Sequence, residues 1–146
     1  MGNTGKLIRG RALVAGEAAG EALVSSEPLS FWGGYDSSSG EIIDRRHPLS
    51  GKIAAGRVLV IPSTRGSSTT TAVLLESVKS KTAPLAIITR KTDSFLSLAS
   101  IVADEMYEKP IPIVAVEPED FSSFQTGQWI EVRPDGQIST DYSVRS

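Results

Sequence analysis

Three short apolar runs alternate with two helical patterns in the middle of the chain. The runs at residues 57–61, 85–89 and 111–116 are rich in Val, Ile and Leu, which is typical of strands buried on both faces. Residues 69–80 and 94–109, which lie between the runs, carry apolar side chains at helical spacing. This alternation predicts a βαβαβ core, with two right-handed crossovers on a parallel sheet.

The two ends of the chain predict further strands on either side of this core. Residues 7–14 and 18–25 are apolar-rich runs separated by glycines, and residues 129–132 and 137–140 flank a Pro-Asp-Gly turn. We interpret each pair as a hairpin. The predicted fold is therefore α/β, a three-layer β/β/α sandwich with helices on one face of the sheet. The stripe that we expect to pack against the sheet in the second helix contains Phe95, Leu98, Ile101 and Val102.

A long irregular stretch, residues 27–56, separates the first strands from the core. It contains several glycines and prolines, and only residues 41–43 look strand-like. Loops of this length are usually functional or disordered. Its aromatic residues, Phe31, Trp32 and Tyr35, argue against disorder, so we expect an ordered loop pinned by aromatic anchors.

Composition narrows the classes of function. The chain has 15 basic and 17 acidic residues and a net charge of −2, without the basic stripe that would suit a nucleic acid or a membrane surface. It has no cysteine, its one histidine is His47, and no Asp/Glu cluster has ligand spacing. We therefore expect no metal site within the chain. No stretch reaches the roughly 20 apolar residues of a membrane span, and we expect a cytoplasmic protein.

Candidate chemistry is concentrated in residues 62–71, PSTRGSSTTT, which join the first core strand to the first helix. Active sites of open α/β sheets gather at this edge, at the carboxyl ends of the parallel strands. Gly66 allows the backbone to approach a ligand closely, the helix start favours an anion, and Arg65 suits a bidentate carboxylate contact. Ser67 and Ser68 place hydroxyl groups at the mouth of this site.

The serines of this loop are also compatible with a purely structural role. Ser67 or Ser68 could be only the N-cap of the helix, because serine is preferred at that position. A Walker P-loop is excluded, since the GK[ST] ending is missing. A Ser-His-Asp triad is possible by residue inventory, but the G-x-S-x-G pattern is absent and the histidine is in a distant loop.

The run RGSS before a helix resembles the serine loop of the swivelling domain in the aconitase superfamily. Beyond this loop, the chain resembles the swivel domain, or small subunit, of aconitase X. The matching stretches are GEALVSSEPLSFWGGYD, GEIIDRRHPLSG, AGRVLVIPSTRGSSTTTAVLLE, APLAII and VADEMYEKPIPIV. The resemblance extends from Leu7 to about Val132. It implies a single swivelling β/β/α domain over residues 1–146, with an ordered core at about 6–141.

In that family, the first serine after the glycine is an alkoxide-like base that removes the substrate proton, which assigns this role to Ser67. Neighbouring amides and the second serine hold the substrate carboxylate, so Gly66 and Ser68 are the corresponding binding residues. Thr69 stands where aconitase itself has a substrate-gripping arginine. We expect Thr69 to contact the substrate and Arg65, before the glycine, to replace that arginine.

The resemblance also implies a hydro-lyase that is active only with a large catalytic subunit, in a heterodimer or a larger assembly. That partner would carry the cysteines, an iron–sulfur cluster or iron, and most of the site for a small hydroxy acid. The expected substrate is cis-3-hydroxy-L-proline, since the loop RGSST is more similar to the bacterial pattern than to the archaeal KGST. The alternative substrate is mevalonate 5-phosphate, and an alternative of another class is a stand-alone anion-binding module.

Residues 27–56 contain further candidates for contact with the substrate or the large subunit. They are Phe31, Trp32, Arg46 and His47. The pair Phe31-Trp32 precedes two glycines, as in anchored but adaptable interface loops, although Trp32 could instead plug the edge of the core. Arg46 could simply be solvated, and His47 could hold a hydrogen bond within its loop.

Overall fold

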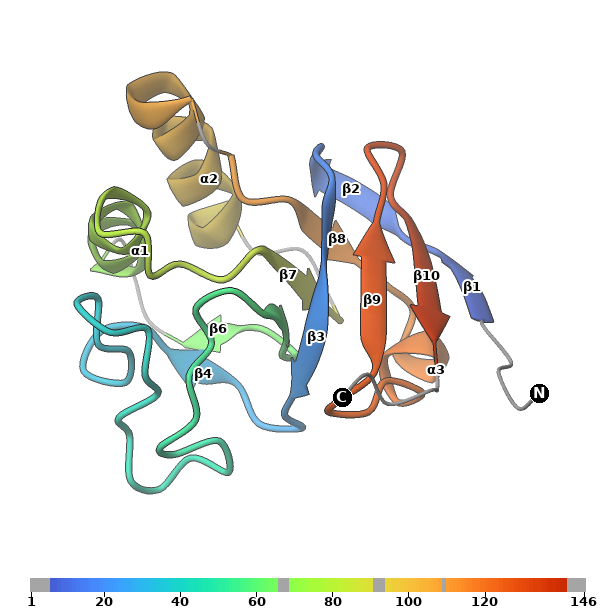
Figure 1. Ribbon diagram of the computed structural model, residues 1–146, viewed down its shortest axis with the longest axis horizontal. Helices are drawn as coiled ribbons and strands as arrows, with labels where there is room; N and C mark the ends of the chain where they lie inside the picture. Colours follow the sequence, from blue (N-terminus) through green and yellow to red (C-terminus); the bar gives the residue numbers. More distant parts are fainter. Residues whose placement is uncertain (1–5, 66–68, 91–93, 109, 142–146) are drawn as a thin grey trace.

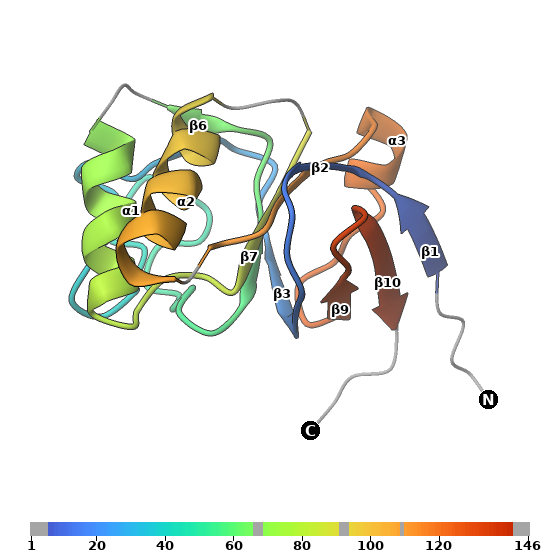
Figure 2. The same ribbon diagram turned by 90° about the horizontal axis from the view of Figure 1, so that it is seen from above.

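The computed structural model describes residues 6–65, 69–90, 94–108 and 110–141. Its architecture is a sandwich of three layers, in which two helices, a mostly parallel sheet and an antiparallel sheet follow one another (Figure 1, Figure 2). The strands are β1 (Lys6–Arg9), β2 (Arg11–Val14), β3 (Ala18–Val24), β4 (Leu29–Ser30), β5 (Val58–Val60), β6 (Thr64–Arg65), β7 (Ala86–Thr89), β8 (Ile113–Ala115), β9 (Trp129–Val132) and β10 (Gln137–Asp141). The helices are α1 (Thr69–Lys79), α2 (Ser94–Tyr107) and α3 (Pro118–Phe121).

The βαβαβ core predicted from the sequence is confirmed. β5, β7 and β8 pair in parallel in that order, and α1 and α2 are the crossovers between them. With the outer strands they form one continuous series of paired strands in the order β1-β10-β9-β3-β5-β7-β8-β2. This series bends to form both the antiparallel and the mostly parallel sheet of the sandwich (Figure 2). Both long helices cover the same face of the parallel strands (Figure 2), so the three-layer arrangement is also confirmed.

The first and last strands of that order are consecutive in the chain, which closes the sheet on itself. β1 pairs with β10 and β2 pairs with β8, and Gly10 is the corner between β1 and β2. A side chain at Gly10 would collide with Val114, so the corner needs glycine. β3 forms a second corner, because its first half pairs with β9 and its second half pairs with β5.

The two predicted hairpins have different outcomes. β9 and β10 form the C-terminal hairpin, and Gly136 adopts a φ of +91° in its turn. The prediction of an N-terminal hairpin is wrong, because β2 and β3 pair with other strands and not with each other. Both N-terminal runs bend from one sheet into the other, so their partners come from distant parts of the chain.

Alternation along the parallel strands divides the hydrophobic core into two clusters. Leu59 and Ile87 belong to the cluster beneath the helices, whereas Val58, Val60 and Ile88 belong to the cluster between the two sheets. All five are fully buried. Successive side chains on a strand point to opposite faces, so each apolar run contributes to both clusters. This is why the runs are apolar at every position.

The stripe predicted on α2 is displaced by one residue from the buried one. Leu98 and Ile101 are 49% and 50% exposed, whereas Leu96, Ala99 and Ala103 are buried against the core. Two apolar stripes at helical spacing lie side by side on this helix. The sequence favoured the stripe with Leu98 and Ile101 as the buried one, because its side chains are larger. The structure buries the stripe with the alanines, because small side chains let the helix pack closely.

Residues 27–56 form an ordered excursion from the sheet, as predicted, with β4 and two isolated bridges as its regular structure. Two aromatic residues anchor it. The rings of Phe31 and Tyr35 lie 5.0 Å apart, and the Tyr35 hydroxyl donates a hydrogen bond to the Thr82 carbonyl at 2.7 Å. Burial of Tyr35 raises its pKa above the usual value, so its hydroxyl remains protonated and can donate.

Candidate active site

The serine loop follows the carboxyl end of β5, at the edge of the sheet where a ligand site is expected. β5 is followed by β6, which ends at Arg65. Gly66, Ser67 and Ser68 lie outside the described residues, as does the side chain of Thr69, the first residue of α1. The described chain therefore brackets the candidate base between a short strand and the start of a helix.

A short parallel pair connects this loop to the excursion. Leu29 and Ser30 in β4 pair with Thr64 and Arg65 in β6, and the Leu29 N–H donates to the Ser63 carbonyl at 3.3 Å. Neither strand was predicted, because strands of this length carry no periodic signal. The pair fixes Arg65 beside the beginning of the excursion.

Beside β6 lies a hollow of about 540 Å³ that combines acidic and basic side chains, here named the mixed-charge hollow. Its lining residues are Glu27, Pro28, Ser30, Asp44, Arg46, His47 and Arg65. Arg65 Nη2 lies 3.9 Å from Glu27 Oε1, and both side chains are more than half exposed. An exposed ion pair of this kind adds about 0–1 kcal/mol of stability, so both groups remain available to a ligand.

The mixed-charge hollow brings together three residues that the sequence singled out separately, namely Arg65, Arg46 and His47. Asp44 Oδ1 accepts a hydrogen bond from the Arg46 N–H at 3.0 Å, which orders the turn that carries Arg46. Arg46 is exposed. Within the described ranges it forms no ion pair, so two guanidinium groups are available to an anionic ligand.

His47 is a structural residue of this site. Its side chain is buried, and Nε2 lies 3.1 Å from the Pro28 carbonyl and 3.4 Å from the Glu27 carbonyl. Nδ1 accepts a hydrogen bond from the Leu49 N–H at 3.1 Å. These partners assign the neutral tautomer with the proton on Nε2. Because both ring nitrogens are occupied, His47 holds the wall of the hollow in place. This is the hydrogen-bonding role within its loop that the sequence left open as an alternative.

Two neighbouring aromatic candidates have opposite environments. Phe31 has no exposed surface and packs in the core, so it is not available to a substrate or a partner, contrary to our expectation. Trp32 is 67% exposed and does not plug the core. Ser30 Oγ, on the wall of the mixed-charge hollow, donates to the Trp32 carbonyl at 2.9 Å. The Trp32 backbone therefore lies beside a residue that lines the hollow, and a contact role for its side chain stays a prediction.

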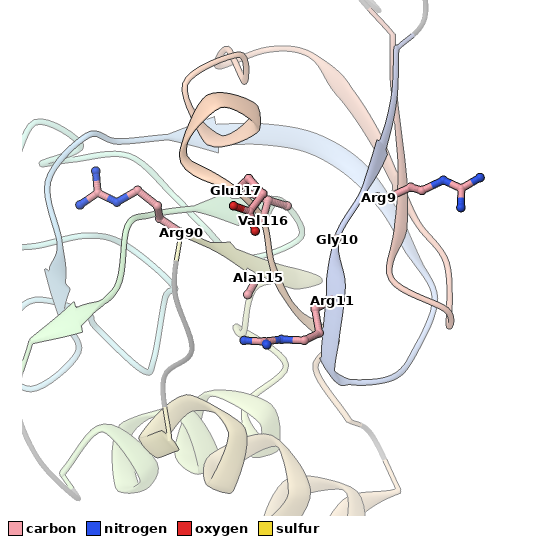
Figure 3. Close-up of a pocket in the computed structure, with 7 residues that line it drawn as sticks. All are labelled: Arg9, Gly10, Arg11, Arg90, Ala115, Val116 and Glu117. Carbon is pink, nitrogen blue, oxygen red and sulfur yellow. The ribbon is translucent and has the colours of Figure 1, made fainter.

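Sequence reasoning missed a second group of arginines, at the carboxyl ends of β7 and β8. Arg9, Arg11 and Arg90 line a hollow of about 230 Å³ together with Glu117. Figure 3 shows that the three guanidinium groups point in different directions and do not converge on a common point. Arg90 instead lies over the Phe121 ring, 5.9 Å from its centroid. This hollow is therefore a weaker candidate for an anion site than the mixed-charge hollow.

The described residues do not fit a metal cofactor. They contain no group of three or more His, Asp or Glu side chains that could hold a metal ion, and the whole sequence has no cysteine for an iron–sulfur cluster. In the same part of the chain, no helix is both long enough and apolar enough to cross a membrane.

Comparison with known proteins assigns the chain to a family. The sequence model of the aconitase X swivel domain matches residues 7–140. The chain belongs to the aconitase X swivel domain family. The resemblance carried by the RGSS run and its surrounding stretches is thus confirmed.

Relatives of this swivel domain occur within proteins of different length. The chain is 46% identical to the cis-3-hydroxy-L-proline dehydratase of Pseudomonas aeruginosa over 90% of its own length, but spans only 22% of that protein. It is 39% identical to the phosphomevalonate dehydratase small subunit of Methanothermobacter thermautotrophicus, covering 75% of this chain and 79% of that protein. The crystal structure of Thermococcus kodakaraensis aconitase X (holo-form) matches with a TM-score of 0.83 at 33% identity, over 92% of this chain and 98% of that chain.

Proposed function

We propose that this swivel domain acts as the small subunit of an aconitase X-type hydro-lyase, in which Ser67 is the base that removes the substrate proton. The observation that carries the proposal is the sequence RGSS, which begins at the last residue of β6 and precedes α1, in a chain of this family. The swivel domain would contribute the base and part of the anion site. The rest of the active site would come from a larger subunit.

The surroundings of Ser67 support this role. A serine hydroxyl is a very weak base unless positive charge and N–H groups stabilise its alkoxide. α1 begins at Thr69 and has no acidic residue in its first turn, so the positive end of its dipole is not neutralised by its own side chains. Arg65, just before the loop, adds a guanidinium that lines the mixed-charge hollow.

The substrate carboxylate would be held by the same hollow. Arg65 and Arg46 both line it, and a guanidinium can form two parallel hydrogen bonds to a carboxylate. Ser68 would add a hydroxyl hydrogen bond beside the base. With the carboxylate fixed, the proton on the neighbouring carbon would be acidified and within reach of the base.

The leaving hydroxyl needs a group that this chain does not hold. An iron–sulfur cluster or iron in the large subunit would act as a Lewis acid on that hydroxyl. Two relatives support such a division, because the chain spans only 22% of the Pseudomonas aeruginosa protein but 79% of a protein named as a dehydratase small subunit. We expect the isolated chain to fold and to be inactive.

For the substrate, we propose cis-3-hydroxy-L-proline. The identity of 46% to a dehydratase of that compound, against 39% to a phosphomevalonate dehydratase small subunit, supports this choice. The test is to combine the chain with its large subunit and assay both compounds. Turnover of mevalonate 5-phosphate without turnover of cis-3-hydroxy-L-proline would reverse the preference. Tight binding of a simple anion by the chain alone, with no partner, would favour a stand-alone binding module.

The assignment of the base is tested by two neighbouring variants of the assembled enzyme. Ser67→Ala should abolish turnover while leaving assembly intact, because it removes the base and little else. Ser68→Ala should chiefly raise KM, because it removes one contact to the substrate. If Ser67→Ala kept a near-normal kcat and Ser68→Ala lost it, the base would be Ser68.

A further inference from the structure

The mixed-charge hollow contains two carboxylates as well as two guanidinium groups. Glu27 and Asp44 line it together with Arg46 and Arg65. A site that binds only anionic groups gains nothing from carboxylates, since like charges repel. A ligand that carries a positive and a negative group would use both kinds of side chain.

Glu27 is the acidic residue best placed for such a ligand. Its N–H donates to Ser25 Oγ at 2.9 Å, and Ser25 Oγ donates back to its carbonyl at 3.2 Å. His47 Nε2 lies 3.4 Å from the same carbonyl. The backbone of Glu27 is therefore held at several points, while its side chain remains 55% exposed. Asp44 is less free, because its Oδ1 already accepts the Arg46 N–H.

The contact between Glu27 and Arg65 is loose. The N–O distance of 3.9 Å is about 1 Å longer than in a charge-assisted hydrogen bond. Each group can thus accept or donate a closer hydrogen bond to a ligand without losing a strong one. The two opposite charges are adjacent, as are the carboxylate and the ammonium that an α-amino or α-imino acid carries on the same carbon atom.

We propose that Glu27 is a specificity-determining residue that accepts a hydrogen bond from the ring ammonium of an imino-acid substrate, while Arg65 binds its carboxylate. This inference rests on the proposed function, and it adds the residue that selects a zwitterion. A substrate with a carboxylate and a phosphate has no cation for Glu27 and is repelled by it. The acidic half of the hollow thus favours hydroxyproline over a phosphorylated hydroxy acid.

The test compares two ring acids as ligands of the assembled enzyme, by calorimetry and by inhibition. L-Proline has the ring ammonium, and (S)-tetrahydrofuran-2-carboxylate has an ether oxygen in its place. Glu27→Gln should weaken L-proline binding by roughly 10-fold, the size expected for a hydrogen bond between charged groups. It should leave the ether acid unchanged or bound more tightly. KM for cis-3-hydroxy-L-proline should rise by a similar factor, with little change in kcat.

Two further variants separate this role from a structural one. Glu131→Gln is the matched control, because Glu131 forms a similarly exposed ion pair of 4.0 Å with Arg133 on the antiparallel sheet. This variant should leave the affinity for both ligands unchanged. Glu27→Asp keeps the charge and should restore part of the L-proline affinity. If Glu27→Gln tightened both ligands equally, Glu27 would merely compete with the substrate for Arg65. If Glu27→Gln left the affinity for both ligands unchanged, or if the wild-type complex did not bind L-proline, the inference would also be overturned.

These outcomes can be distinguished from a failure of the proposed function. An enzyme that binds L-proline in a Glu27-dependent manner but does not dehydrate cis-3-hydroxy-L-proline would refute the reaction and support the role of Glu27. An enzyme that dehydrates this substrate with an unchanged KM in Glu27→Gln would support the reaction and refute the role of Glu27.

Discussion

The sandwich and the excursion of residues 27–56 are stabilised in different ways. In the sandwich, neighbouring strands share continuous ladders of backbone hydrogen bonds, and alternate side chains fill two clusters. The excursion has isolated bridges, the short β4–β6 pair and scattered turn hydrogen bonds instead of continuous ladders. Its shape depends on single side chains such as His47 and Tyr35. We therefore expect the loss of one polar contact to matter less in the sandwich than in the excursion that lines the candidate site.

The largest effect on stability is expected in the sandwich. Leu59 is fully buried in the cluster beneath the helices, and Leu59→Ala should lower the free energy of unfolding by about 2–5 kcal/mol through lost burial and a cavity. Leu98→Ala is the matched control, because Leu98 is 49% exposed on α2, and it should cost less than about 1 kcal/mol. Urea unfolding of the chain measures both. Equal losses of unfolding free energy in the two variants would contradict the exposure of Leu98 on α2.

In the excursion, a single polar side chain should have a comparable local effect. His47→Ala removes the ring that lies 3.1 Å from the Pro28 carbonyl and accepts the Leu49 N–H. The loss of buried partners should destabilise the excursion by about 1–3 kcal/mol. Amide hydrogen exchange at Leu49 should accelerate, while exchange in β5 and β7 should not.

Arg45→Ala is the control for this variant, because Arg45 is an exposed neighbour of His47 that does not line the mixed-charge hollow. It should leave exchange at Leu49 unchanged. Faster exchange throughout the sandwich in His47→Ala would show that the two regions unfold as one unit, and that the contrast between them is wrong.

Tyr35 offers a smaller effect with a distinct pH dependence. Tyr35→Phe removes the 2.7 Å hydrogen bond to the Thr82 carbonyl and should cost about 1 kcal/mol at neutral pH. Burial raises the pKa of Tyr35 in the folded state. Above about pH 10, the unfolded chain therefore releases this proton first, and the wild type loses stability as pH rises. The variant lacks this loss, so the difference in unfolding free energy between the two proteins should shrink between neutral pH and about pH 11. A constant difference would contradict burial of the ionisable hydroxyl.

The same contrast determines which parts of the fold were predictable from sequence. The parallel core was predictable because each run of Val, Ile and Leu reports burial on both faces of a strand. The pairing of β2 and β3 was not, since Gly10 and the bend in β3 direct each strand to a partner far along the chain. Local patterns contain no information about such partners.

The loop of the candidate site gave a signal in the sequence, whereas most of its walls gave none. Glycine, serines and a helix start form a local signal at Gly66 and Ser67, and the family resemblance gave it a chemical meaning. Glu27 gave no signal, because it becomes relevant only when the β4–β6 pair brings it within 3.9 Å of Arg65. His47 was noticed as a histidine, but its structural role depends on carbonyl groups some 20 residues away in sequence.

Substitution of Trp32 should have the smallest effect on folding and the largest effect on assembly with the large subunit. Trp32 is 67% exposed, and its backbone carbonyl accepts a hydrogen bond from Ser30 Oγ, which lines the mixed-charge hollow. Trp32→Ala should change the unfolding free energy by less than about 0.5 kcal/mol. If the large subunit covers the hollow and the neighbouring Trp32, the same change should weaken its binding by roughly 10-fold or more, since a buried tryptophan is a frequent hot spot. Titration of the large subunit with each variant measures this, with Leu98→Ala as an exposed apolar control on α2. If Leu98→Ala weakened binding and Trp32→Ala did not, the partner would dock on the helical face, and the serine loop would need a further movement to reach the metal.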